Sequence, residues 1–187
     1  MSRRSVCTIV VVVALSSWVG TPALAQQNSL SLNLGYFTLR GEDTRIPDDV
    51  IVENLGLFAF DLEQFNNTSV GAEWLVGLGD YIEAGFGVGF YQQTVFSVYD
   101  DFVNDDGTEI LQDFKLRVTP LTATARFFPF GRSSAIQPYA GAGVGVFNWR
   151  YSEVGEFIDF STFNLDVFRD QFVAEGNDVG AVYLGGI

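Results

Sequence analysis

The segment from Thr68 to Gln92 alternates between two kinds of residue with a period of two. Its even positions are apolar and mostly bulky, whereas its odd positions are mainly glycine, serine and glutamate. A period of two predicts β-strands, because successive side chains of a strand point to opposite faces. The parity is the same before and after Gly79-Asp80-Tyr81, so we expect a hairpin with a three-residue turn that pairs Leu78 with Ile82.

The two faces of this hairpin differ in a way that favours a membrane over water. One face is bulky and apolar, and the other is mostly glycine with Glu73 and Glu83. Glycine and a few charges suit the narrow polar interior of a small barrel, which leaves the bulky face toward lipid. A soluble β-sandwich or a lipocalin-like barrel is the alternative. The residues expected to face lipid, two of them from a later strand, are Val70, Trp74, Val76, Ile82, Phe86, Val88, Val144 and Val146.

The first 25 residues have the pattern of a secretory signal peptide. Arg3 and Arg4 precede an apolar run over 6–15, and Ala23-Leu24-Ala25 is a small-residue cleavage motif. We expect residues 1–25 to be removed and residues 26–187 to form one β-barrel domain. No later run is long and apolar enough for a membrane helix. A membrane-embedded form must therefore be a closed barrel, which satisfies its own backbone groups in lipid.

Four further strands are expected outside the hairpin, over 30–39, 114–128, 137–149 and 179–187. In the second of these the apolar parity changes near Thr119-Pro120. Because proline cannot donate to the ladder, we expect a β-bulge there.

Long acidic loops are expected over 40–67, 94–113 and 150–178, which hold seven, six and seven of the 23 acidic residues. The first contains an apolar patch, Leu55–Phe60, that can extend a strand or form a short helix. In the second, the sequence from Asn104 to Gly107 predicts a turn. Long loops that alternate with short turns are typical of bacterial outer-membrane barrels.

The run LRVTPLTATARFFPF and the following IQPYAGAGVGVFNW resemble the small outer-membrane β-barrels of the OmpA transmembrane domain, OmpW and opacity-protein type. In that group an aromatic-rich turn leads into a strand with P-Y-x-G-x-G-x-G. The resemblance implies an all-β fold, an antiparallel up-and-down transmembrane β-barrel of eight strands that ends on an aromatic residue. Six strands are expected here and the chain ends Gly185-Gly186-Ile187, so the expectation is a chain that lacks the last hairpin.

Catalysis is not expected, and no cofactor, catalytic or metal residue is assigned. The chain has no histidine, so a Ser-His-Asp triad or an Asp-His pair cannot form. Two inward glutamates can act as an acid–base pair, but a buried charge is costly without a partner. We therefore expect a lumen charge network that fills the pore, formed by Glu73, Glu83, Lys115, Arg117 and Arg126.

The expected partners follow from the charge and the expected location. A formal net charge of −13 argues against nucleic acid. The resemblance implies outer-membrane lipid and lipopolysaccharide, and the barrel-assembly machinery during insertion. The acidic loops are candidates for divalent cations. The leading hypothesis is an outer-membrane protein with a structural or surface-interaction role, and the alternatives are a narrow channel for small or hydrophobic solutes and a soluble secreted ligand-binding barrel.

Overall fold

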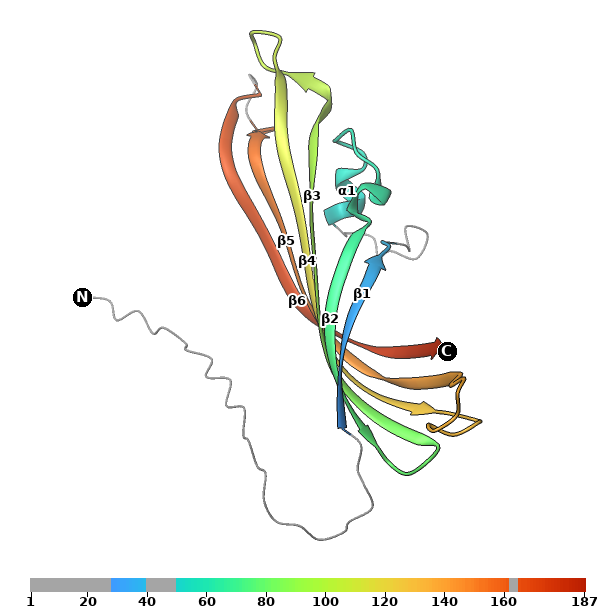
Figure 1. Cartoon of the computed structure of the whole chain (residues 1–187). Helices are drawn as coiled ribbons and strands as arrows, with labels where there is room; N and C mark the ends of the chain where they lie inside the picture. Colours follow the sequence, from blue (N-terminus) through green and yellow to red (C-terminus); the bar gives the residue numbers. More distant parts are fainter. Residues whose placement is uncertain (1–27, 40–49, 162–164) are drawn as a thin grey trace, which may run out of the picture.

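The computed structural model describes residues 28–39, 50–161 and 165–187, and the expected signal peptide lies outside them. Six antiparallel strands form one sheet in which every strand pairs with its neighbour in sequence, as the sequence predicted for an all-β meander. The sheet is strongly twisted (Figure 1). Among the described residues, no helix has the length and apolar character needed to cross a membrane. The strands are β1 Asn28–Phe37, β2 Asn67–Gly77, β3 Ile82–Val103, β4 Glu109–Phe127, β5 Tyr139–Ile158 and β6 Val167–Gly186.

The hairpin of β2 and β3 has the predicted turn and register. Trp74 pairs with Phe86, so the two large even-numbered residues are direct cross-strand neighbours. The amide of Leu78 donates to the carbonyl of Ile82 at 2.8 Å, which closes the three-residue turn. Gly79 has a φ of 87°, a left-handed conformation that glycine adopts without steric cost.

Two of the predicted long acidic loops are wrong. β3 and β4 continue through the segment 94–113 and leave only a tight turn between Val103 and Glu109. In that turn the Asn104 amide donates to the Thr108 carbonyl at 2.8 Å, so the predicted turn signal is confirmed. Likewise β5 extends to Ile158, and β6 begins at Val167 rather than near residue 179. The acids of these segments therefore lie on strands and at their tips.

The predicted bulge at Pro120 is also wrong. Pro120 pairs with Phe147, and the β4–β5 register is constant along the whole ladder. Gly89 of β3 makes this possible, because a Cβ there would lie 2.7 Å from Cγ of Pro120. The missing side chain leaves room for the proline ring in a regular strand. Side-chain parity along β4 consequently does not change.

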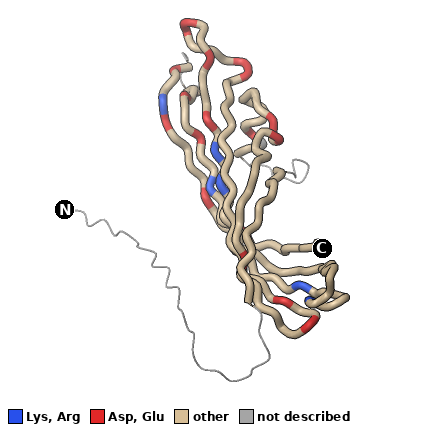
Figure 2. The backbone as a smooth tube through the Cα atoms, in the orientation of Figure 1, with Lys and Arg blue, Asp and Glu red and all other residues tan. Residues whose placement is uncertain are grey.

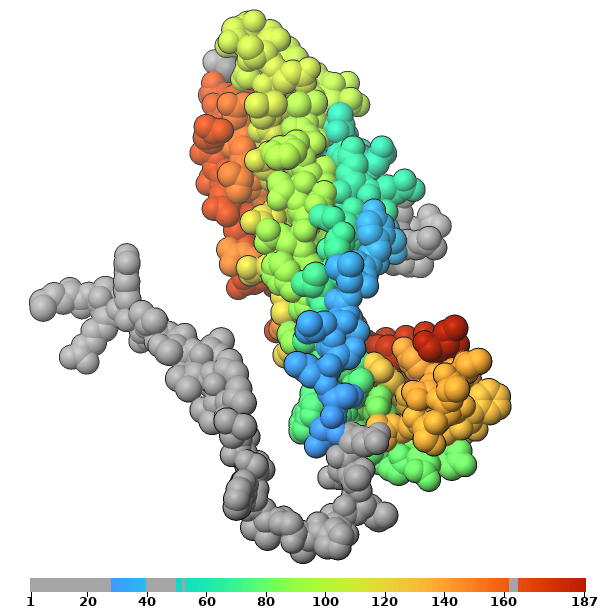
Figure 3. Space-filling model, viewed as in Figure 1, coloured from blue at the N-terminus to red at the C-terminus, as the bar shows by residue number. Residues whose placement is uncertain are grey.

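A segment between β1 and β2 covers one face of the upper part of the sheet. It contains the short helix α1, Val50–Asn54, and the 3-10 helix η2, Leu62–Phe65. The Phe58 and Phe60 rings each lie 4.9 Å from the Phe114 ring, within the main buried apolar cluster. The predicted patch Leu55–Phe60 forms one bridge to β3, with the Ala59 amide donating to Val98 at 2.9 Å. Figure 3 shows this segment packed beside β3.

The covered face is called the inner face below, and the opposite one the outer face. Because the registers are constant except for a shift in the β3–β4 pair between Val98 and Val103, each face can be followed along the strands. The lower part of the sheet comprises residues 28–34, 70–77, 82–90, 119–127, 140–148 and 177–186, and the upper part lies beyond them.

Polarity changes sides between the two parts. In the upper part the inner face is an aromatic core, with Tyr91, Phe114 and Tyr151 buried. The outer face there is mixed, with exposed charged residues beside exposed apolar ones such as Phe96 and Leu111. In the lower part the outer face is apolar and exposed, and the inner face carries glycines and the buried Glu73 and Glu83.

Candidate functional site

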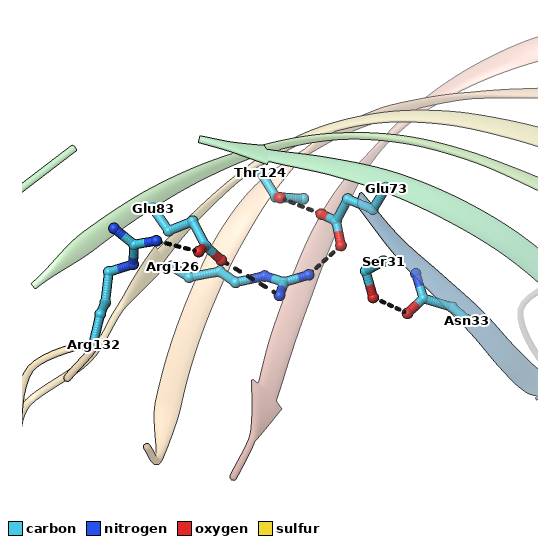
Figure 4. A network of polar contacts seen from close by, with 7 residues as sticks. All are labelled: Ser31, Asn33, Glu73, Glu83, Thr124, Arg126 and Arg132. Atoms are coloured by element: carbon cyan, nitrogen blue, oxygen red, sulfur yellow. Dashed lines mark hydrogen bonds and ion pairs between the residues drawn. The ribbon is translucent and has the colours of Figure 1, made fainter. Parts of the chain in front are cut away.

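The candidate site is a group of charged side chains on the inner face of the lower part, drawn in Figure 4. Glu83 of β3 and Arg126 of β4 are direct cross-strand partners, and Nη1 of Arg126 lies 3.7 Å from Oε1 of Glu83. Nη2 of Arg126 also pairs with Oε2 of Glu73 on β2. The hydroxyl of Thr124 donates to the other oxygen of Glu73 at 2.9 Å. Three strands therefore contribute to one connected set of contacts.

Arg132, a member that the sequence did not indicate, enters from the turn between β4 and β5. Its Nη2 lies 3.1 Å from Oε2 of Glu83, and its Nη1 donates to the Gly79 carbonyl at 3.3 Å. The backbone places it, because the Arg132 amide donates to the Asp80 carbonyl of the β2–β3 turn at 2.8 Å. No residue pattern signals this contact, since it depends on how two turns meet.

The charges of this inner-face network are balanced and nearly enclosed. Its side chains are 8% exposed for Glu73 and Glu83, 12% for Arg126 and 14% for Arg132. Two carboxylates meet two guanidinium groups, so neither sign is left uncompensated. Arg126 also lies over the ring of Tyr139, with Cζ 5.0 Å from the centroid, an additional cation–π contact.

The side chains of this network occupy the space beside the glycines of the inner face. A Cβ at Gly85 would lie 2.6 Å from the Thr124 hydroxyl and would collide with the Glu73 carboxylate. A Cβ at Gly77 would collide with the Arg132 guanidinium. The absence of side chains at these positions makes room for the charged groups, which fits a structural role better than acid–base catalysis.

Lys115 and Arg117 do not join the network, which corrects the sequence-based prediction. Both are at odd positions of β4, whereas Arg126 is at an even position. Without a bulge at Pro120 the parity is preserved, and both side chains lie exposed on the outer face of the upper part. The prediction assumed a change of parity that the strand does not make.

The eight residues expected to face lipid all lie on the outer face of the lower part. Seven are exposed, from 40% for Val146 to 61% for Val144, and Val76 is half-buried. The structure therefore places these large side chains on the surface and the glycines on the inner face. Their contact with lipid stays a prediction.

A second buried polar contact lies in the upper part, where α1 meets the sheet. The Asn54 side-chain amide donates to Oε1 of Glu153 at 2.6 Å and to the hydroxyl of Tyr151 at 3.1 Å. Glu153 is only 5% exposed. Burial raises the pKa of this carboxyl above its usual value, while hydrogen bonds to Asn54 and other neighbours act in the opposite direction.

Glu153→Gln is expected to stabilise the protein more at neutral pH than at acid pH. Because folding raises the pKa of the Glu153 carboxyl, the folded state binds this proton more tightly than the unfolded state. The ionised carboxylate therefore destabilises the folded protein. This destabilisation is absent below the unfolded-state pKa and grows as pH rises through the folded-state pKa. The variant removes that effect and keeps an acceptor for Asn54. We expect the free energy of unfolding of the variant, minus that of the parent, to increase between pH 4 and pH 7. Denaturant unfolding at both pH values measures it, and a pH-independent difference contradicts the assignment.

The described residues contain no group of three or more histidine, cysteine or acidic side chains placed to hold a metal ion. The acidic tips do line a depression of about 1000 Å³ that includes Asp106, Glu156 and Asp166. Binding of divalent cations there stays a prediction.

Comparison of the chain with family models, curated proteins and solved structures finds no match.

Proposed function

We propose that this protein is an integral outer-membrane protein of the β-barrel type, with a structural or surface-interaction role and no catalysis. The observation that supports it is the exchange of polarity between the two parts of the sheet. Above Phe90 the sheet buries a mainly apolar cluster on its inner face, as water-soluble proteins do, and its outer face carries exposed charged residues among apolar ones. Below it the arrangement is reversed, and a reversed sheet is stable where the surroundings are apolar.

The size of the apolar region is consistent with a bilayer. On β3 the apolar outer positions run from Ile82 to Phe90, close to the roughly 9–11 residues that a tilted strand needs to cross the hydrocarbon core. Neighbouring strands continue the same band, with Leu121 and Val179 in register with Val88 through the ladder. An exposed apolar surface of this continuity marks an interaction with a membrane or another protein.

The upper part supports a role at the membrane surface. Its acidic residues from Asp100 onward lie on extended strands and on the connections at their tips rather than on the two long loops expected from sequence, so this part of the proposed interaction surface is a folded one. The resemblance in sequence to small outer-membrane barrels agrees with the proposal, as does the expected export signal. Partners proposed with it are outer-membrane lipid, lipopolysaccharide and the assembly machinery.

The inner-face network favours a filled interior over a channel. Glu73, Arg126 and Arg132 occupy the space that the glycines leave. No separate observation supports solute passage, so the channel is not our leading proposal.

Extraction of membranes with sodium carbonate tests the proposal against a soluble secreted protein. Cells that express the full chain are fractionated and the membranes are washed at alkaline pH. We expect the protein to stay in the membrane pellet and to be solubilised only by detergent. Release of the folded protein into the carbonate supernatant contradicts the proposal.

A further inference from the structure

The outer face carries a cluster of positive charge directly above its apolar band. Arg117 of β4 and Arg150 of β5 are direct cross-strand partners, and Lys115 lies on the same face, opposite Ser152. All three side chains are exposed. They form a local basic cluster in a chain whose net charge is −13. Figure 2 shows the basic positions gathered on this part of β4 and β5.

The basic cluster is poorly compensated by the protein itself. Like charges directly opposite each other destabilise an antiparallel pair, and that is the relation of Arg117 to Arg150. Arg150 has one ion pair, 3.7 Å from Glu175, and that glutamate is 69% exposed. No ion pair of Lys115 or Arg117 with another described residue is seen. A bound anion would relieve this repulsion.

The shape of the outer face suits an anion attached to an apolar chain. A groove of about 440 Å³ is lined by Arg117, Asn148 and Arg150 together with one acid, Glu175. A second groove, of about 280 Å³, lies beside Lys115. Below them an apolar groove of about 380 Å³ is lined by Phe86, Leu121, Ala123, Val144, Val146 and Val179.

The spacing of the two regions along the strand fits a lipid. Leu121 in the apolar groove and Arg117 in the basic cluster are four positions apart on β4, or about 13 Å at 3.3 Å per residue. A lipid can therefore place an acyl chain in the lower groove and its phosphate in the upper one.

We propose that Lys115, Arg117 and Arg150 bind the phosphate of an anionic lipid headgroup, with the acyl chain of that lipid in the apolar groove below. This inference rests on the proposed membrane location and adds a specific lipid contact to it. Guanidinium groups suit the task, because they bind phosphate through two parallel hydrogen bonds.

The test compares lipids that differ in headgroup charge. The full chain is folded into phosphatidylcholine vesicles, and spin-labelled phosphatidylglycerol or phosphatidylcholine reports the relative association of each lipid with the protein. The parent should prefer phosphatidylglycerol, and Arg117→Gln should reduce that preference about five-fold, the effect typical of one cation at a charged membrane surface. Arg117→Lys should retain most of it.

Arg169→Gln is the matched control, since Arg169 lies on the same outer face but farther up, opposite Glu156. It should leave the preference unchanged. If both Arg117→Gln and the double variant Arg117→Gln/Arg150→Gln keep the preference for phosphatidylglycerol, the proposed lipid site is wrong. The proposed membrane location is not contradicted by that result. A parent that does not insert into the phosphatidylcholine vesicles contradicts both proposals. If excess inorganic phosphate abolishes the preference at constant ionic strength, the cluster recognises free phosphate and the lipid assignment is wrong.

Discussion

Val144→Arg is expected to lower the free energy of unfolding in a bilayer, and so to destabilise the protein, by about 2–4 kcal/mol, the usual effect of arginine near the bilayer midplane. Val144 is 61% exposed on the outer face of the lower part of β5. In a soluble protein an exposed valine accepts arginine with little change, commonly within about 0.5 kcal/mol. The substitution therefore reports whether lipid or water surrounds this position. Urea-dependent folding into vesicles measures it.

Val154→Arg is the matched control, because Val154 belongs to the same strand and the same face and is 44% exposed. It lies in the upper part, between Asp113 of β4 and Gln171 of β6. We expect it to change stability by less than about 0.5 kcal/mol. Equal, small effects at both positions support a soluble protein and remove the basis of the membrane proposal.

Arg126→Met is expected to cost about 3–5 kcal/mol of stability, the typical result of removing one partner from a buried ion pair. Arg126 is the cation that links Glu73 to Glu83, and both carboxylates are nearly enclosed. Arg132 still pairs with Glu83, so most of the loss arises at Glu73. The measurement is equilibrium unfolding in detergent micelles.

A compensating change separates this charge effect from lost packing. Adding Glu73→Gln to Arg126→Met removes the uncompensated charge and keeps an acceptor for the Thr124 hydroxyl. We expect the double variant to recover a substantial part of the stability. Arg169→Met removes an exposed arginine as a control and should change little. If the double variant is as unstable as the single one, loss of packing accounts for the effect.

The lower part of the sheet could be predicted because one simple rule holds throughout it. From Thr68 to Gln92 the large aliphatic residues and the Trp and Phe residues, except Leu75, have the same parity, so strand, turn, register and face all follow. The Glu73–Arg126–Glu83 contacts were predictable in the same way, since charges on a crowded face need partners.

That rule did not predict the upper part, because there the apolar residues are buried on the inner face, whereas in the lower part they are exposed on the outer face. Along 94–113 and 150–178 the acids lie on strands and at their tips, and some, such as Glu109, Asp113 and Glu156, occupy outer positions, whereas in sequence they look like loop residues. The same reversal explains Lys115 and Arg117. Placing Lys115 and Arg117 on the inner face required a bulge in β4. Because β4 is regular, both residues lie on the outer face instead, which carries charged residues in the upper part.

The contact between the two lower turns has a consequence for local motion. The amide hydrogens of Phe128 and Arg132 are bound to the carbonyls of Tyr81 and Asp80, each at 2.8 Å. Reverse turns usually exchange their amide protons with solvent quickly, since they open without disturbing the rest of a fold. Here one turn cannot open without releasing the other. Deuterium uptake at these two amides should therefore be slow and should track the separation of both hairpins.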